Sequence, residues 1–266
     1  MYVISLAYHV AGAGGHRTCA LGGPGLPLVR VRAAPPEGWA WRPGQRWNDI
    51  RWDGEAVVKR ITRDDARRRR DVEVAMLTRL AGVVPVPRPL SSGDPVAVRM
   101  EYVPGPLAER WVADGYGTLG LEESVRRQVA LVRGYGAMLR ALHAVSPRNF
   151  ADVLPGEGPS VIHADPGPYN VIVDPVDGAV RALIDWELAR IGDPVEDLAL
   201  VEWYLRIWWS SPGDVLRHFY DAYGRLPEWP LRHAAMIERC RGYYAASHDE
   251  VKREQLRRTE AFEELC

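Results

Sequence analysis

Residues 161–170 read VIHADPGPYN, and residues 184–187 read IDWE. The first stretch offers Asp165 and Asn170, five residues apart, and the second offers Asp185, fifteen residues after Asn170. Mg²⁺ takes few oxygen ligands from a protein and leaves its other positions to water and substrate phosphates. These oxygen-bearing side chains therefore predict a magnesium site for phosphoryl transfer, a reaction in which the protein mainly positions reactants and neutralises charge.

Two short apolar runs lie beside these polar residues. They are Val171–Val173 and Ala182–Ile184, with the dipeptide Asp177–Gly178 between them. Apolar runs separated by an Asp-Gly dipeptide are typical of a β-hairpin. We expect a strand pair that carries the polar loops and brings Asp185 to the end of a strand neighbouring the first loop.

Lys59 is an independent signal, because the sequence holds 32 arginines and only two lysines. It lies in the second of two expected strands, 47–52 and 55–61, which a tight turn at Asp53–Gly54 joins. A compact ammonium at the end of a strand suits the positioning of phosphate groups. We therefore expect Lys59 to contact a nucleotide.

The hydrophobic period becomes helical after these strands. Thr62 is the expected cap of a helix with Asp64 and Asp65 in its first turn. Glu73 shares a face of this helix with the apolar residues three, four and seven positions later. A carboxylate among apolar side chains needs a cationic partner, and Lys59 is the candidate. The alternative is a solvated Glu73 on the helix surface.

The rest of the chain is mostly helical. A strand is expected at 96–103, and Pro104–Gly105 then marks the boundary between two parts of the chain. Beyond it, helical periodicity predicts helices at 122–143, 195–209, 214–223 and from 231 to the C-terminus.

The stretches HADPGPYN at 163–170 and LIDWELARIGDPVEDLA at 183–199 resemble the catalytic and metal-binding motifs of the aminoglycoside phosphotransferase and choline kinase-like families, relatives of eukaryotic protein kinases. The resemblance implies an α+β, two-lobed protein kinase-like fold. Residues 1–104 would be a nucleotide-binding lobe with a small antiparallel sheet and one helix. Residues 105–266 would be a larger, mainly helical lobe for catalysis and acceptor binding. Residues 1–41 lie outside the resemblance, and their role stays open.

The same resemblance implies a role for each motif residue. Asp165 would be the catalytic base that orients the acceptor hydroxyl, and Asn170 and Asp185 would be the Mg²⁺ ligands. His163 would brace the loop, and Asp197 would support the loop backbone. Ala164 stands where the family usually has glycine, and Trp186-Glu187 stand where protein kinases have Phe-Gly.

Nucleotide contacts are also implied by the resemblance. Lys59 is similar to the lysine of the kinase V-A-I-K segment, and Glu73 to its glutamate partner. The phosphate-covering loop would be 43–49, which holds one glycine. Its candidate phosphate contacts are Gln45, Arg46 and Asn48. The adenine edge of ATP or GTP would meet the backbone of Glu101, Tyr102 and Val103.

The acceptor is the least defined partner. An aromatic cluster on one expected helix comprises Trp203, Tyr204, Trp208 and Trp209, with Glu202 beside it. Such clusters are usually core packing, but aromatic faces and an acidic group can also hold a cationic or sugar-like acceptor. Residues 1–150 carry a net charge of +8 and the remainder −9, which suits polyphosphate on one side and a cation on the other, unless the charge is simply scattered and solvated. Antibiotics, amino alcohols and nucleoside-like metabolites all remain candidate acceptors, so a role in resistance or in metabolism stays open.

The composition of the chain limits the kinds of partner and environment that we expect for it. A net charge of −1 gives no sign of a nucleic-acid or polybasic membrane surface. No apolar run approaches the roughly 20 residues of a membrane-spanning helix. Three scattered cysteines favour a reducing, cytoplasmic environment. Whether the chain is a monomer or a dimer stays open.

Two other functions compete with the kinase interpretation. A metal-dependent hydrolase would use His163 and Asp165 as metal ligands, but the sequence lacks a second histidine cluster and this leaves Lys59 unexplained. A pseudokinase or nucleotide-binding module would keep the fold and lose the chemistry. A protein acceptor is disfavoured, because no insertion between Asp185 and Gly192 could dock a peptide.

Overall fold

The computed structural model describes residues 48–118, 121–208, 212–244 and 250–265. The predicted phosphate contacts Gln45 and Arg46 lie outside this part of the chain, as does Trp209. The residues of the predicted magnesium site lie within it, together with Lys59 and Glu73.

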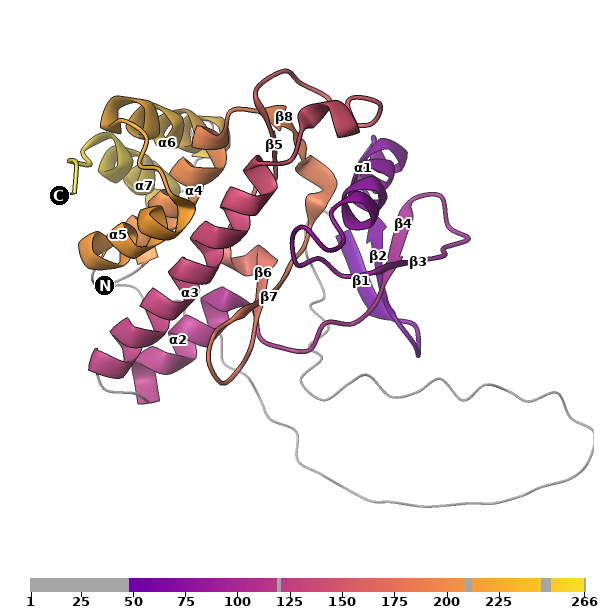
Figure 1. The fold of residues 1–266 in the computed structure, drawn as a ribbon, viewed down its shortest axis with the longest axis horizontal. Helices are drawn as coiled ribbons and strands as arrows, with labels where there is room; N and C mark the ends of the chain where they lie inside the picture. Colours follow the sequence, from indigo (N-terminus) through magenta and orange to yellow (C-terminus); the bar gives the residue numbers. More distant parts are fainter. Residues whose placement is uncertain (1–47, 119–120, 209–211, 245–249, 266) are drawn as a thin grey trace, which may run out of the picture. The chain divides into compact units, whose positions relative to one another are not determined.

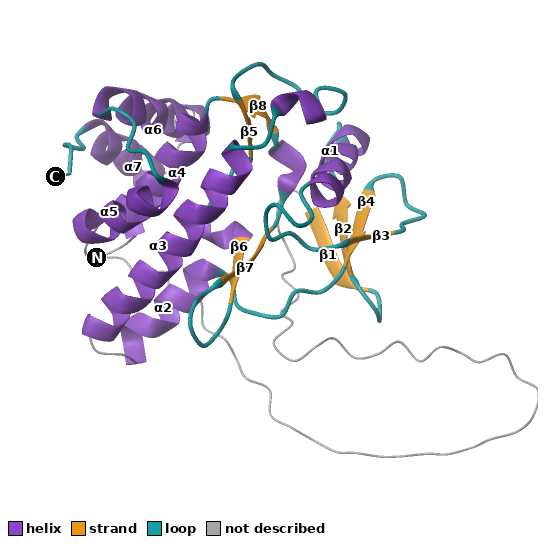
Figure 2. Ribbon diagram, in the orientation of Figure 1, coloured by secondary structure: helices purple, strands orange, loops and turns teal. Residues whose placement is uncertain are grey.

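An antiparallel sheet begins the described chain. Its strands are β1 (Asn48–Trp52), β2 (Val57–Ile61), β3 (Pro89–Leu90) and β4 (Ala97–Met100), in the order β1-β2-β4-β3 (Figure 2). Lys59 pairs with Ile50 on one side and Val98 on the other, so it lies on a central strand. The predicted hairpin is confirmed. The Asp53 side chain accepts hydrogen bonds from the backbone N–H groups two and three positions later, and Gly54 has φ +101°.

One helix, α1 (Ala66–Arg79), packs against this sheet. The prediction that Thr62 caps it is wrong, because the helix begins four residues later with Asp65 at the N-cap position. Asp64 and Asp65 therefore precede the first turn, and the Asp65 carboxylate accepts from the Arg69 guanidinium at 2.6 Å. The inward orientation expected for Glu73 is confirmed, since the residue is 1% exposed.

The remainder of the chain is mainly helical (Figure 1). Its helices are α2 (Ala108–Thr118), α3 (Leu121–His143), α4 (Pro194–Trp208), α5 (Pro212–Tyr223), α6 (Trp229–Tyr244) and α7 (Glu250–Glu260). Helices α3 and α5 pack closely, because a Cβ atom on Gly136 would lie 2.3 Å from the carbonyl oxygen of Phe219. The sequence did not predict α2, whereas the helical region expected from residue 231 to the C-terminus contains α6 and α7.

Two small strand pairs interrupt the helices. The predicted pair is confirmed as β6 (Val171–Val173) with β7 (Val180–Leu183), joined through Gly178 at φ +75°. A second pair, β5 (Ser160–Ile162) with β8 (Arg190–Gly192), was not predicted. Asp165 follows β5, Asn170 directly precedes β6, and Asp185 follows β7.

The arrangement confirms the expected fold class, an antiparallel sheet with one helix followed by a mainly helical part. The division at residue 104 stays a prediction. Among the described helices, none combines the length and apolar character needed to cross a membrane.

Candidate active site

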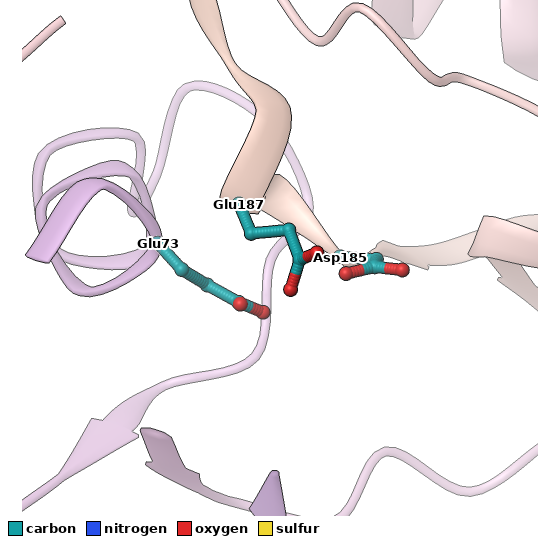
Figure 3. A group of neighbouring side chains, drawn as sticks. All are labelled: Glu73, Asp185 and Glu187. Atoms are coloured by element: carbon teal, nitrogen blue, oxygen red, sulfur yellow. The ribbon is translucent and has the colours of Figure 1, made fainter. Parts of the chain in front are cut away.

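A cluster of four charged side chains, three of them buried and Asp185 partly exposed, joins the sheet to the helical part. The Lys59 ammonium on β2 donates to Glu73 Oε2 on α1 at 2.6 Å and lies 3.0 Å from Glu187 Oε2. It also donates to Asp185 Oδ1, in the segment just after β7. The three carboxylates each place an oxygen within 4.8 Å of the others (Figure 3). The ammonium therefore offsets part of the repulsion among carboxylates that could not otherwise lie so close together.

The charges of this cluster shift its pKa values. Burial alone would lower the pKa of Lys59, but the carboxylates of Glu73, Asp185 and Glu187 together raise it above its usual value. Burial raises the pKa of Glu73 to about 7, against the opposing effect of the ammonium. Burial also opposes ionisation of Asp185, yet the pKa of Asp185 is lowered, because Lys59 outweighs the desolvation. Lys59 is thus cationic across the physiological range.

Glu187 is a member of this cluster that the sequence did not assign. It lies on the short helix η3 (Trp186–Leu188) and is 6% exposed. Its Oε2 also accepts from Asn48 Nδ2 at 3.0 Å, so it links β1 to the segment after β7. The sequence signal that could have identified Glu187 is its position two residues after Asp185. A short helical turn there brings both side chains towards Lys59.

Strand pairing brings the backbone segments that carry the two predicted Mg²⁺ ligands side by side. Asn170 ends the short helix η2 (Pro168–Asn170) just before β6, and Asp185 follows β7. The backbone N–H of Ile184 donates to the Asn170 carbonyl at 2.9 Å, extending the β6–β7 pairing beyond the strands. Asn170 Nδ2 donates to the Asp165 carbonyl at 2.9 Å, which fixes the orientation of the amide. All three predicted motif residues therefore lie in one small region.

These donors fit a hard cation. Asn170 offers an amide oxygen and Asp185 a carboxylate, both of which are ligand types that Mg²⁺ accepts. Asp185 has φ +68°, a left-handed conformation that is costly for a residue other than glycine. Such conformations gather at functional sites where the surroundings enforce them. Metal binding by Asn170 and Asp185 stays a prediction.

Asp197, on α4, holds the backbone of the loop that precedes Asp165. Its carboxylate accepts from the backbone N–H of His163 and of Ala164, each at 2.8 Å, and His143 Nε2 lies 3.1 Å from it. Burial opposes its ionisation, but His143 and the backbone donors keep the pKa of Asp197 below its usual value. A permanent anion therefore clamps the loop. Ala164 has φ +66°, which accounts for the glycine usual at this position in the resembled family.

His163 is fully buried behind the loop. Its Nε2 donates to the Ile184 carbonyl at 3.0 Å, and its Nδ1 accepts from the Asp165 backbone N–H at 3.2 Å. Burial lowers the pKa of His163, which keeps the ring neutral, and the Asp165 N–H that donates to Nδ1 leaves the ring proton on Nε2. The ring also lies 4.5 Å from the Trp186 ring, centre to centre. Because both ring nitrogens are engaged, this contact pattern supports a bracing position and speaks against the hydrolase alternative.

Asp165 and Asp185 line one cavity of about 240 Å³. Asp165 Oδ1 accepts from Tyr169 Oη at 2.7 Å and from Arg239 Nη2 on α6 at 2.9 Å. Tyr204 Oη in turn donates to Tyr169 Oη at 2.9 Å. The sequence did not single out Tyr169 or Arg239, and Arg239 comes from a helix far along the chain, which no local pattern could connect to the motif.

The prediction that Glu202 helps to hold a cationic acceptor is wrong. Glu202 is fully buried and accepts from Arg206 at 2.7 Å, from Tyr220 at 2.6 Å and from Arg232 at 2.5 Å. Its charge is therefore neutralised inside the protein. Trp203 and Tyr204, by contrast, both line the cavity with Asp165.

The predicted nucleotide contacts lie along the sheet. Glu101, Tyr102 and Val103 follow β4, and the Glu101 backbone N–H donates to the Arg88 carbonyl at 3.0 Å. Asn48 begins β1 and lines the same cavity as Asp185. Contact of these residues with a nucleotide stays a prediction.

Solved structures with a similar fold belong to antibiotic phosphotransferases. One is APH(2")-IIa in a ternary complex with streptomycin and ATP, with a TM-score of 0.59 and 16% identity over 82% of this chain and 89% of that chain. Another is aminoglycoside 2'-phosphotransferase-IIIa with GDP, with a TM-score of 0.63 and 15% identity over 82% and 90%. A third is the macrolide 2'-phosphotransferase MphH from Brachybacterium faecium, with a TM-score of 0.56 and 19% identity over 84% and 91%. Their likeness defines the class of fold, the protein kinase-like fold of these phosphotransferases.

Sequence comparison gives the family. Residues 44–157 and 148–235 match the phosphotransferase enzyme family, which is more than half of the 266-residue chain. The chain belongs to this family of small-molecule phosphotransferases. A stretch of 52 residues is 44% identical to viomycin phosphotransferase from Streptomyces vinaceus, and it spans 19% of this chain and 18% of that protein.

Proposed function

We propose that the chain transfers the γ-phosphate of ATP or GTP to a hydroxyl group of a small molecule. The cavity that Asp165 and Asp185 share is the observation that carries this proposal, because it puts a candidate base and a candidate metal ligand in contact with the same space. Membership of the phosphotransferase family supports the reaction type. The ATP and GDP complexes of proteins with this fold support a nucleoside triphosphate as donor.

Lys59 and the predicted Mg²⁺ site would act on the donor. Lys59 is a permanent cation whose ammonium lies among carboxylates, one of them Asp185, so phosphate oxygens entering this space can take over as acceptors of its hydrogen bonds. Mg²⁺, held by Asn170 and Asp185, would neutralise charge on the phosphate groups. Glu73 keeps Lys59 in place by a contact of 2.6 Å inside the protein.

Asp165 would act on the acceptor. Tyr169 and Arg239 both contact Oδ1, which fixes the plane of the carboxylate. The clamp from Asp197 to the loop backbone holds Asp165 in position. As the acceptor oxygen bonds to phosphorus and the bond to the nucleoside diphosphate breaks, the hydroxyl proton passes to the Asp165 carboxylate.

A nucleotide-consumption screen tests this proposal. The full chain is incubated with Mg²⁺ and with ATP or GTP, together with hydroxylated compounds that include aminoglycosides, macrolides, viomycin, amino alcohols, hydroxy acids and nucleosides. We expect at least one compound to stimulate formation of nucleoside diphosphate and to gain a phosphate, detected by mass spectrometry. Nucleotide binding without any transfer across the panel would favour the pseudokinase alternative. A cytoplasmic location stays a prediction.

A further inference from the structure

We infer that the acceptor carries an anionic group, such as a carboxylate, and that Arg239 binds this group beside the reacting hydroxyl. This inference rests on the proposed function, because only a transferase has an acceptor. It goes further in naming the chemical class of that acceptor and the residue that selects it.

The position of Arg239 is the first argument. Its Nη2 lies 2.9 Å from Asp165 Oδ1, the carboxylate at which the acceptor hydroxyl must arrive. The side chain is 29% exposed and lines the cavity, so a ligand in the cavity can reach it. Any acceptor bound at Asp165 therefore places its neighbouring atoms against a guanidinium. A guanidinium has several N–H donors in one plane and can bind two carboxylates or a carboxylate with two oxygens.

The distribution of charge in the cavity is the second argument. The carboxylates among its described lining residues are Asp165, Asp185 and Glu187, and the cations are Arg63 and Arg239. Asp185 and Glu187 both contact the Lys59 ammonium, on the donor side. On the acceptor side this leaves Asp165, which Arg239 already neutralises. A cationic acceptor would meet only a carboxylate that is already paired with Arg239 on this side of the cavity, whereas an anion would meet a guanidinium.

The burial of Glu202 argues against a cationic acceptor, the alternative class of acceptor. Sequence patterns offered Glu202 as the acidic group for a cationic acceptor, but its carboxylate is held by Arg206 and Arg232 inside the protein. The negative charge of the second half of the sequence therefore does not reach the cavity through this residue.

Aromatic side chains define the rest of the acceptor. Trp203, fixed by a hydrogen bond from its Nε1 to Thr259 Oγ1 at 2.8 Å, lines the cavity with Tyr204. Tyr204 and Tyr169 lie edge to face, with ring centres 5.5 Å apart. Rigid aromatic walls suit a flat or apolar body. The inferred acceptor is thus an aromatic or apolar-faced hydroxy acid.

Binding of three matched alcohols tests the inference without requiring turnover. The probes are 4-(hydroxymethyl)benzoate, 4-(hydroxymethyl)benzamide and 4-(hydroxymethyl)benzylamine, which share a ring and a hydroxyl and differ in charge. Their affinities for the full chain are measured by calorimetry or ligand-observed NMR. We expect the benzoate to bind about 10- to 100-fold more tightly than the benzylamine, the worth of one charge-assisted contact.

The variant Arg239→Gln should reduce this preference to about threefold or less, because the guanidinium that supplies the charge-assisted contact is gone. Arg241→Gln is the matched control, since Arg241 lies on the same helix and pairs with Glu260 at the surface. It should keep the preference of the wild type. Circular dichroism confirms that each variant is folded.

Three results would overturn the inference: equal or tighter binding of the benzylamine, a preference unchanged in Arg239→Gln, or no benzoate binding at millimolar concentration. Failure of the proposed function is distinguishable from these. If benzoate binding depends on Arg239 but no compound ever accepts phosphate, the anion site stands and the transferase proposal fails. If transfer occurs and the accepted compounds are cations, the transferase proposal stands and this inference fails.

Discussion

At the residue scale, the site depends on side chains and backbone angles that are unfavourable by themselves. Among the described residues other than glycine, Ala164 and Asp185 are the two with positive φ. Both lie in segments that carry site residues, where hydrogen bonds such as Ala164 N–H to Asp197 Oδ1 hold the conformation. The surrounding fold compensates for this local cost.

Ala164→Gly should stabilise the protein. The left-handed conformation costs alanine about 1–2 kcal/mol, and glycine avoids this at an entropic penalty of about 0.4–1 kcal/mol in the unfolded chain. We expect a gain of about 0.5–1 kcal/mol in the free energy of unfolding, measured in urea. Ala141→Gly, inside α3, is the control and should cost about 1 kcal/mol. Equal losses in the free energy of unfolding in both variants would show that the backbone at Ala164 is not strained.

Lys59→Met should leave the buried carboxylates of Glu73 and Glu187, and the partly exposed one of Asp185, without their ammonium. Breaking a buried ion pair costs about 3–5 kcal/mol, and we expect a loss of this size in the free energy of unfolding at pH 8. The pKa of Glu73 is already raised, to about 7. A raised pKa contributes stability that is present at low pH and lost as the pH rises through the folded value, so the deficit of the variant should shrink towards pH 5.

A second substitution checks this account of Lys59. Adding Glu187→Gln to Lys59→Met removes one of the crowded charges and should recover part of the lost stability at pH 8. Denaturant titrations at pH 8 and pH 5 measure both effects. If the free energy of unfolding lost in Lys59→Met were the same at both pH values, and the double variant recovered none of it, the three carboxylates would not repel one another.

At the scale of elements, the sequence predicted the helices and strands whose signals lie within a few residues of one another. The hairpin through Asp53–Gly54, the long helix α3 and the β6–β7 pair all carry their signals within a few residues, and the structure confirms them. Helix α2 was missed because it follows Pro104–Gly105 and contains glycines at 115 and 117, which favour a loop, while burial of Trp111 and Val112 stabilises the helix instead.

Other features had no local signal. The β5–β8 pair joins two strands of three residues each, far apart in the sequence, so no turn dipeptide marks it. Thr62 was chosen as a cap from residue type, but the turn at Arg63–Ala66 delays the helix. In the site, the motif residues were found from spacing, whereas Glu187 and Arg239 were not, because their roles depend on tertiary contacts with Lys59 and Asp165.

Gly178→Ala tests the element that aligns Asn170 with Asp185. At φ +75°, an added Cβ would lie 2.3 Å from Trp111 Cη2, in a ring fixed by a hydrogen bond to the Pro175 carbonyl. We expect a loss of about 1–3 kcal/mol in the free energy of unfolding, from the left-handed conformation and the overpacking. Gly213→Ala in α5 is the control, because its Cβ would meet no atom within 4 Å. The control should be neutral or slightly stabilising, and similar losses in both variants would contradict the close approach to Trp111.

At the scale of the whole molecule, Lys59, Glu73, Asp185 and Glu187 connect the sheet part to the helical part through one set of charges. The proposed donor and acceptor sites share the cavity that Asp185 and Asp165 line. We therefore propose separate tasks for the two aspartates. Asp185, with Lys59, serves the nucleotide, whereas Asp165 serves the acceptor.

Turnover and nucleotide affinity of Asp165→Ala, measured side by side with an accepted compound, test this central claim most directly. We predict that the rate of phosphate transfer falls by about 10²- to 10⁴-fold, the worth of a general base, while nucleotide affinity changes little. Removal of Mg²⁺ with a chelator should abolish transfer in the wild type. An Asp165→Ala variant that transfers phosphate at the wild-type rate would contradict the account.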